Sequence, residues 1–286
     1  RLLDQENQQV ADFLTTDHPM QPFSRRCFQG VAAIGSYNPA WLPSSEEGER
    51  APFLSASLPE PDAALREVDL EKLVRFWRHP VRFFLEQRLG LRLGNFDASL
   101  EESEPFQLDQ LQRYLLRQET VSAHLEDMPT GQHLAALLGS GRLPQAGFGR
   151  IQFQEVEAEA EVIASQLQPL LTDLLEPMEI DRRIGPFHLT GWLHNLSSLG
   201  RVTWRPGRLK GADLMEWWLA HLCLSLLRPP GQPLRSLHLS WERQNKVTGV
   251  VQSLLQPVDD PEPILAHLLD LYWQGLSRPL DRKSVV

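Results

Sequence analysis

The sequence predicts an α/β protein: a mixed β-sheet flanked by helices and preceded by an irregular N-terminal arm. Three observations lead to this fold class. Residues 1–65 are rich in Pro, Ser and Gly, residues 69–175 follow helical spacing, and short alternating runs interleave with helices after residue 178. We therefore expect an arm or linker at residues 1–65 and a domain at residues 66–286.

The helical part begins at a capping residue. Asp69 can accept hydrogen bonds from the first turn of a helix that ends near Arg78. Pro80 inside one long helix would cost about 3 kcal/mol, so we expect a second helix with Pro80 at its first position. Apolar spacing predicts further helices at 107–126, 131–139 and 153–175.

Alternation of apolar and polar residues then predicts strands. Three short runs alternate, at 178–182, 187–193 and 201–205. With a turn at 195–200, the second and third runs are interpreted as an antiparallel hairpin. After Pro206-Gly207 the pattern predicts a helix at 213–226, a strand at 236–241 and a helix at 263–276.

Composition limits the possible functions. A net charge of -9 argues mildly against a free-standing DNA-binding domain, because such domains gain affinity from Lys and Arg. A local basic face or a basic partner would still allow DNA binding. Cys27 and Cys223 are the two cysteines, which excludes a disulfide framework and favours a reducing, cytoplasmic setting. No run approaches the roughly 20 apolar residues of a membrane span, so no membrane contact is expected. Because the chain begins with Arg1, we expect a piece of a longer protein.

Motifs for common cofactors and metals are missing from the sequence. There is no G-x-x-x-x-G-K-[ST] loop for ATP, no G-x-S-x-G elbow, no H-E-x-x-H helix and no calcium loop. Among nine scattered histidines, His188 and His194 stand nearest a common strand, and a structural role is favoured over metal ligation for each. We expect neither a cofactor nor a metal ion.

The run Gly191-Trp192-Leu193-His194, a turn and then 201–205 resembles the core of PD-(D/E)XK nucleases of the helicase–nuclease type. Those enzymes hold Mg²⁺ with carboxylates on adjacent strands and use a nearby Lys. Here His194 and Thr203 stand at the two carboxylate positions and Arg205 at the Lys position, so the resemblance implies a degenerate site with no catalytic residue. An ordinary hairpin with Gly and Trp by chance explains this run alone equally well.

Further stretches, in order along nearly the whole chain, resemble the RecC family, the gamma subunits of exodeoxyribonuclease V. They are HPMQPFS (18–24), FWRHPVRFF (76–84), SEPF (103–106), LQRY (111–114), LP followed by GFG (143–149), TGWL (190–193), WRP (204–206) and GLS followed by PL (275–280).

The resemblance implies a C-terminal RecC segment: a nuclease-like domain without a working active site, preceded by helicase-like domains that scan for the Chi sequence. In that family the subunit scaffolds the two motor subunits, RecB and RecD, of the RecBCD helicase–nuclease. It also helps to split duplex DNA and to channel the single strands. The implied partners are therefore RecB, RecD and double- and single-stranded DNA.

Two basic groups are candidate DNA contacts. Helical spacing brings Arg75, Arg78 and Arg82 to one face, although a solvated face with ion-pairing neighbours is at least as good an interpretation. The second group surrounds the degenerate site and is favoured, with Trp204 as a candidate to stack a base. Its basic members are Arg201, Arg205, Arg208 and Lys210. Trp217 and Trp218 cannot face one direction on a helix, so one of them is expected at a domain or subunit contact.

Two alternatives stay open at this point. One is an active Mg²⁺-dependent DNA exonuclease whose ligands come from Asp173, Glu176, Glu179, Asp181 and Asp213. The other is a helical partner-binding domain unrelated to nucleases, which requires the predicted hairpin to be wrong.

Overall fold

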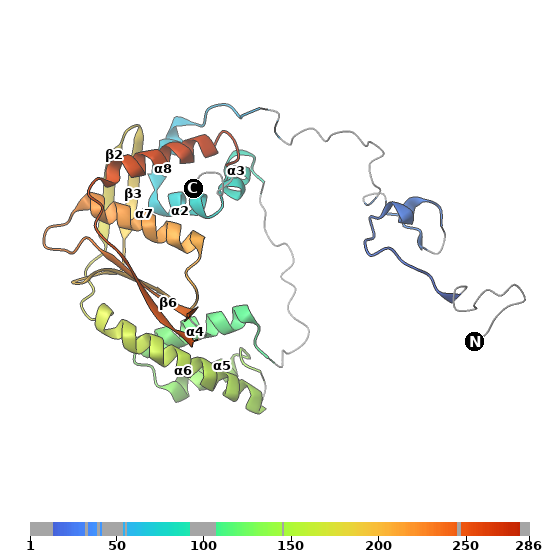
Figure 1. Cartoon of the computed structure of the whole chain (residues 1–286), viewed down its shortest axis with the longest axis horizontal. Helices are drawn as coiled ribbons and strands as arrows, with labels where there is room; N and C mark the ends of the chain where they lie inside the picture. Colours follow the sequence, from blue (N-terminus) through green and yellow to red (C-terminus); the bar gives the residue numbers. More distant parts are fainter. Residues whose placement is uncertain are drawn as a thin grey trace, which may run out of the picture. The chain divides into compact units, whose positions relative to one another are not determined.

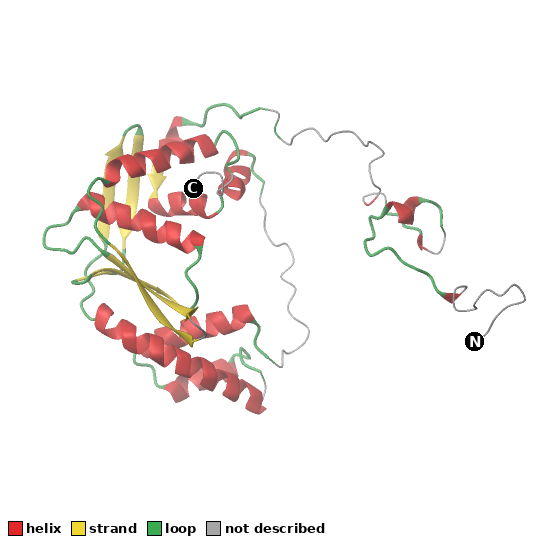
Figure 2. Cartoon of the chain, viewed as in Figure 1, coloured by secondary structure: helices red, strands yellow, loops and turns green. Residues whose placement is uncertain are grey.

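The computed structural model describes residues 14–31, 34–38, 41, 54, 56–91, 107–144, 146–244 and 247–280. The SEPF stretch and residues 281–286 lie outside them. The chain divides into two compact units, Arg1–Ala56 and Ser57–Val286. The smaller unit contains the 3-10 helix η1 (Arg25–Phe28) and a stacked pair, Phe23 and Trp41, with ring centroids 5.9 Å apart. The larger unit contains the sheets and the helices that flank them (Figure 2).

The larger unit is α/β, as predicted, but it contains two mixed sheets where one was expected. The first has the order β1-β3-β2 and the second β4-β5-β6-β7. In the first sheet β3 is parallel to β1 and antiparallel to β2; in the second, β5 is antiparallel to β4 and parallel to β6, and β7 is antiparallel to β6. Their bounds are β1 (Glu67–Asp69), β2 (Met178–Ile184), β3 (Phe187–Leu193), β4 (Leu196–Ser197), β5 (Gly200–Arg205), β6 (Ser236–Gln244) and β7 (Val247–Leu255). Two mixed sheets also show that the helical-domain alternative is wrong.

The predicted hairpin between 187–193 and 201–205 is wrong, although both strands exist. β3 pairs with β2 across the turn at Gly185, and β5 pairs with β4 in the register Leu196↔Arg201. Asn195, directly after β3, has a left-handed φ of 60° and redirects the chain. Its carbonyl accepts from the Val202 amide at 2.8 Å, which extends the short β4–β5 hairpin. Alternation identified the strands correctly, but local turns determine which strands pair.

The break at Pro80 is confirmed. Helix α2 (Leu70–Arg78) is capped by Asp69, whose Oδ1 accepts from the Glu71 amide at 2.8 Å. Helix α3 (Pro80–Arg88) begins with Pro80 at its first position, where the missing N–H has no intrahelical partner to lose. The short strand β1, which the sequence pattern did not predict, leads directly into this cap.

The later helices match the predicted ones, with shifted ends. They are α4 (Gln110–Leu125), α5 (Thr130–Gly139), α6 (Ala146–Leu171), α7 (Gly211–Leu227) and α8 (Pro261–Gly275). Helix α6 begins at Ala146, earlier than the predicted start at residue 153. The prediction missed this first part because Gly147 and Gly149 weaken the local helical signal. A Cβ on Gly149 would lie 2.1 Å from the Pro144 carbonyl oxygen, so this close approach requires glycine.

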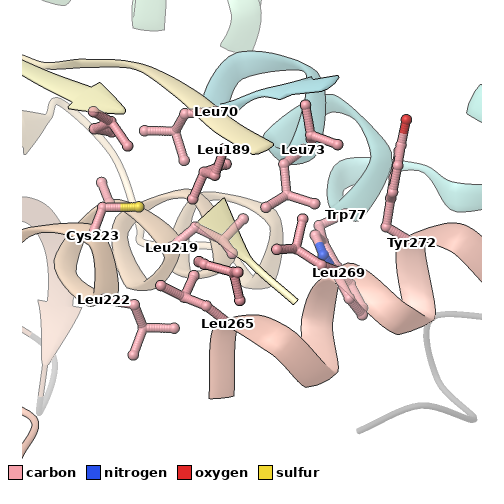
Figure 3. Close-up of a cluster of buried hydrophobic side chains, with 14 of the residues drawn as sticks. Leu70, Leu73, Trp77, Leu189, Leu219, Leu222, Cys223, Leu265, Leu269 and Tyr272 are labelled. Carbon is pink, nitrogen blue, oxygen red and sulfur yellow. The ribbon is translucent and has the colours of Figure 1, made fainter. Parts of the chain in front are cut away.

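The first sheet supports the main hydrophobic core. Side chains from β3, α2, α7 and α8 meet there, among them Leu73, Leu189, Leu219 and Leu269 (Figure 3). Cys223 of α7 belongs to the same cluster and is fully buried. Burial raises the pKa of the Cys223 thiol to about 12.

The second sheet has one apolar and one polar face. Val202 and Leu239 pack against Val121 of α4 and Ile163 of α6. Because side chains alternate along a strand, the other face of β5 carries Arg201, Thr203 and Arg205, and the neighbouring positions of β6 are Ser236, His238 and Ser240. Figure 1 shows α4, α5 and α6 together on one side of β6 and α7 on the other. Helix α7 therefore covers a sheet face made of polar and charged side chains.

Candidate functional site: an arginine-lined cleft

A cleft of two adjoining hollows lies beside α7. The first, here called the β5 hollow, has a volume of about 400 Å³ and includes Tyr114, Thr203, Arg205, Asp213 and His238 in its lining. The second, the β3 hollow, measures about 310 Å³ and includes Val74, Arg75, Trp192 and His194 in its lining. Both hollows share Arg78, Arg201 and Glu216. The cleft thus collects residues from α2, both sheets, α4 and α7.

The three positions compared with nuclease ligands all line this cleft. Thr203 and Arg205 line the β5 hollow, whereas His194 is exposed and lines the β3 hollow. The structure therefore brings these positions to one region, although they do not come from one hairpin. The chemistry of each side chain now decides what the cleft can bind.

Thr203 and His238 form a neutral pair. The Thr203 hydroxyl donates to the Leu237 carbonyl at 3.2 Å and lies 2.9 Å from Nδ1 of His238, which leaves Nδ1–H as the donor to Thr203 Oγ1. Burial lowers the pKa of His238, with smaller contributions from nearby charges. Its Nε2 is buried without a hydrogen-bond partner in the described part of the chain. At neutral pH this pair adds no charge to the cleft.

Two of the three carboxylates that line the cleft are paired with an arginine, whereas Glu71 of the β3 hollow has no ion pair among the described residues. Arg205 Nη1 donates to Asp213 Oδ2, and its guanidinium lies over the Tyr114 ring, 5.2 Å from the centroid. Arg78 Nη2 donates to Glu216 Oε2 and so joins α2 to α7. Asp213 and Glu216 are thus held by guanidinium groups, which repel a metal cation.

Arg201 differs from Arg78 and Arg205 in having no ion pair among the described residues, although Nε of Arg205 is also buried without a hydrogen-bond partner. The Nε and Nη1 atoms of Arg201 are sealed from solvent and have no hydrogen-bond partner among the described residues. Burial lowers the pKa of the guanidinium, and Glu216 acts in the opposite direction. An arginine nevertheless keeps its proton in proteins. Arg201 therefore places an incompletely compensated positive charge between the two hollows.

The remaining basic candidates lie at different places. Arg75 lines the β3 hollow with its guanidinium 6.0 Å from the Phe83 ring centroid, while Arg82 pairs with Glu86 at 2.8 Å outside the hollows. Arg208 and Lys210 are exposed and lie outside the residues that line the cleft. The structure thus brings Arg75 and Arg78 into the cleft with Arg201 and Arg205.

The burial of three tryptophans bears on the roles predicted for them. Trp217 is only 4% exposed and its ring lies 5.4 Å from that of His238, which leaves Trp218 as the member of the pair for the predicted domain or subunit contact. Its helix is buried on nearly all sides and therefore hides both faces. Trp218 is half-buried against the main core, and Trp204 packs partly against the second-sheet cluster while also lining the β5 hollow.

Trp192 is the functional candidate that the sequence interpretation missed. It is 53% exposed and lines the β3 hollow. The signal was present in the alternation of β3, since Trp192 shares parity with His188 and Thr190, opposite the buried Leu189 and Leu193. An exposed tryptophan beside arginines is a typical platform for a nucleic-acid base.

The alternative carboxylates are scattered. Asp173, Glu176 and Glu179 are exposed outside the cleft, and Asp181 bonds to His188 at 2.7 Å, which leaves Asp213 as the member of that set in the cleft. Within the described ranges, no three or more His, Cys, Asp or Glu residues are grouped so that they could hold a metal ion. In the same residues, no helix has the length and apolar character that a bilayer span requires.

Two mixed sheets with helices around a polar, arginine-lined cleft define an α/β domain whose cleft suits an anionic ligand. Residues 65–281 match the RecC C-terminal domain, and the chain belongs to this family. The RecBCD enzyme subunit RecC of Escherichia coli (strain K12) is 30% identical over 281 residues, which is 97% of this chain and 24% of that protein. The resemblance to RecC is thereby confirmed.

Two further relatives bear the same name. The RecBCD enzyme subunit RecC of Haemophilus influenzae is 31% identical over 165 residues, 54% of this chain and 14% of that protein. The one from Buchnera aphidicola of Acyrthosiphon pisum is 24% identical over 161 residues, 56% of this chain and 15% of that protein. The chain spans about a quarter or less of the length of these relatives.

Proposed function

We propose that this chain is a non-catalytic structural and DNA-guiding module of a RecC subunit. It acts within an exodeoxyribonuclease V complex in double-strand break repair by homologous recombination. Its relatives are named as subunits of the RecBCD enzyme, which supports RecB and RecD as the partner subunits. Duplex DNA and the single strands released from it are the proposed nucleic-acid partners.

The pairing of two of the cleft carboxylates is the observation that carries the non-catalytic part of this proposal. Mg²⁺ prefers several oxygen anions, whereas Asp213 and Glu216 already bind Arg205 and Arg78. Thr203 contributes a neutral hydroxyl and His194 an imidazole, neither of which is a good substitute for a carboxylate. The same guanidinium groups favour a phosphate backbone near the cleft.

We also propose that the domain has a PD-(D/E)XK nuclease-like ancestry. Two features support this: the cleft lies where β3, β5 and α7 come together, and His194, Thr203 and Arg205 line it. An ancestral metal site at this place would have been converted into a cationic cleft by the exchange of carboxylates for neutral and basic side chains. This part of the proposal explains why a wide polar cleft persists beside α7.

A nuclease assay tests the non-catalytic proposal. The purified chain is incubated with linear duplex and single-stranded DNA in Mg²⁺ and in Mn²⁺, and we expect no metal-dependent degradation. Asp213→Asn serves as the cleft variant and Asp173→Asn as the matched control, since Asp173 is an exposed carboxylate outside the cleft. Degradation that Asp213→Asn abolishes and Asp173→Asn preserves would establish the alternative, an active Mg²⁺-dependent exonuclease.

A binding assay tests the scaffold and guiding parts. Fluorescence anisotropy of a labelled forked duplex at low salt should increase with the chain, and the signal should fall steeply as salt is added. Co-purification of the complete RecC subunit with RecB and RecD should be weakened when residues 57–286 are deleted. Unchanged assembly and no fork binding would together contradict the proposed module.

A further inference from the structure

The strand β5 presents three polar residues to the cleft, and two of them have internal partners. Thr203 bonds to His238, and Arg205 bonds to Asp213. Arg201 has two guanidinium nitrogens, Nε and Nη1, that lack a hydrogen-bond partner within the described residues. A sealed donor without an acceptor is unfavourable, and a sealed charge more so. Because Arg205 leaves only its Nε without a partner and already binds Asp213, Arg201 is the residue on this face with the most unmet donors and no bound carboxylate.

The charges around Arg201 leave it without a dedicated counter-ion. Glu216 of α7 contacts Arg78 of α2, and Asp213 of α7 contacts Arg205. His238 of β6 is kept neutral by burial. Among the described residues that line the two hollows, four guanidinium groups (Arg75, Arg78, Arg201 and Arg205) face three carboxylates (Glu71, Asp213 and Glu216). An anion is the ligand class that corrects this imbalance.

Arg201 borders both hollows, although its Nε and Nη1 atoms are themselves sealed from solvent. It belongs to the lining of the β5 hollow and of the β3 hollow, whose volumes are about 400 and 310 Å³. Cavities of this size accept small molecules or single nucleotide units. Trp192, 53% exposed, and Arg75 line the β3 hollow beside it.

We propose that Arg201 binds a phosphate group in this cleft, and that the group is a phosphodiester of a single DNA strand whose base stacks on Trp192. A guanidinium group donates strong, charge-assisted hydrogen bonds to phosphate oxygens, and an indole ring offers a face that any base can cover. This inference rests on the proposed DNA-guiding function and names the residues that hold the strand.

A stability measurement separates ligand binding from a structural role. If Arg201 only supported the fold, Arg201→Met would lower the melting temperature of the ligand-free chain. If Arg201 instead serves to bind a ligand, Arg201→Met retains the packing and removes an uncompensated charge. The melting temperature of this variant in chloride should then equal or exceed that of the wild-type chain. Arg150→Gln is the matched control, since Arg150 is exposed on α6 and outside the cleft lining.

Inorganic phosphate is the first probe. At matched ionic strength, replacing chloride by phosphate should raise the melting temperature of the wild-type chain and of Arg150→Gln, but not that of Arg201→Met. An unchanged phosphate shift in Arg201→Met, or a lower melting temperature of this variant in chloride, would overturn the proposal.

A labelled oligothymidylate is the second probe, read by anisotropy over a range of salt. Loss of one phosphate contact should reduce the slope of log K against log salt by about 0.7 in Arg201→Met, with no reduction in Arg150→Gln. Trp192→Ala should weaken oligonucleotide binding by roughly fivefold or more and leave the phosphate shift intact.

The two probes also distinguish the sources of the phosphate. A phosphate shift without oligonucleotide binding by the wild-type chain would point to a free anion and contradict both the strand and the guiding function. Oligonucleotide binding with equal slopes in wild type and Arg201→Met would overturn the role of Arg201 and leave the proposed function standing.

Discussion

At the scale of single residues, His188 joins three strands of the first sheet. Its Nδ1 lies 2.6 Å from Glu67 Oε2 on β1, and its Nε2 lies 2.7 Å from Asp181 Oδ1 on β2. The hydrogen bond to Asp181, followed by that to Glu67, raises the pKa of His188, and the bond to His188 lowers the pKa of Asp181. The protonated imidazole thus bridges two carboxylates across the sheet.

This bridge predicts a pH dependence of stability. A raised pKa in the folded state means that the contribution of His188 is complete below its ordinary value of about 6.5 and is lost as pH rises through the folded value. The difference in unfolding free energy between wild type and His188→Gln should therefore shrink in urea titrations as the pH is raised from below the ordinary value of about 6.5 through the higher folded-state pKa. The contribution of Asp181 to stability has the opposite pH dependence, because its folded-state pKa is lowered. It is lost in acid, as the pH falls below the ordinary pKa of about 3.9.

The control for this prediction is His267→Gln, because His267 is exposed on α8. Its stability should follow the wild-type pH profile. A difference between wild type and His188→Gln that stays constant across the same range would show that the bridge carries no net charge effect.

At the scale of elements, the packing of α8 on α2 depends on one small residue. A Cβ on Gly275 would lie 2.5 Å from two ring atoms of Phe76, and Phe76 is fully buried. Neither the ring nor the helix can yield without moving the main core. Gly275→Ala should therefore lower the unfolding free energy by about 1–3 kcal/mol in chemical denaturation.

The matched control is Gly131→Ala in α5, where an added Cβ meets nothing within 4 Å. Alanine has the better helix propensity, so this variant should gain up to about 0.5–1 kcal/mol. Opposite signs for the two substitutions test the contact itself. Equal effects would mean that α8 shifts away from α2 at little cost.

Local signals predicted most elements but not their pairing. Asp69 and Pro80 act through neighbouring backbone groups, so the sequence alone located α2 and α3 within a residue or two. The division into two sheets depends on the left-handed conformation of Asn195. This conformation leaves no trace in the alternation of apolar and polar residues from which the strands were predicted. Strands β1 and β4 are too short for a periodic signal, and β7 was missed beside β6.

At the scale of the whole molecule, residues 57–65 pack with the larger unit. The Leu58 amide donates to the Ser277 carbonyl at 2.8 Å, Arg88 donates to the Pro59 carbonyl at 2.7 Å, and the Tyr272 hydroxyl donates to the Leu65 carbonyl at 3.4 Å. These bonds join the segment to both α3 and the end of α8. The compact unit thus begins before the boundary that composition suggested at residue 65.

Two fragments test this boundary. The fragment 57–286 should unfold in a single cooperative urea transition, whereas 66–286 should unfold at lower urea because it lacks the bonds of the segment. Three lost hydrogen bonds correspond to a decrease of about 1.5–4.5 kcal/mol at most. Identical midpoints would place the functional boundary at residue 65 after all.

The cleft is also a property of the whole molecule, and this limits its prediction from sequence. Thr203, Arg205 and Arg201 were chosen from one strand, and all three line the cleft. Asp213 and His238, the partners of Arg205 and Thr203, come from α7 and β6, and the neighbouring pair Glu216 and Arg78 joins α7 to a helix far earlier in the chain. Which arginine is paired and which is left over follows from these distant contacts.

The buried thiol of Cys223 has a practical consequence. Within the larger unit Cys223 is the sole cysteine, since the other, Cys27, precedes Ser57. Alkylating reagents attack the thiolate, and a pKa of about 12 together with full burial withholds that form in the closed protein. In the fragment 57–286, iodoacetamide would therefore react only during openings of the α7 core. The rate of carboxamidomethylation, followed by mass spectrometry, therefore measures how often this core opens.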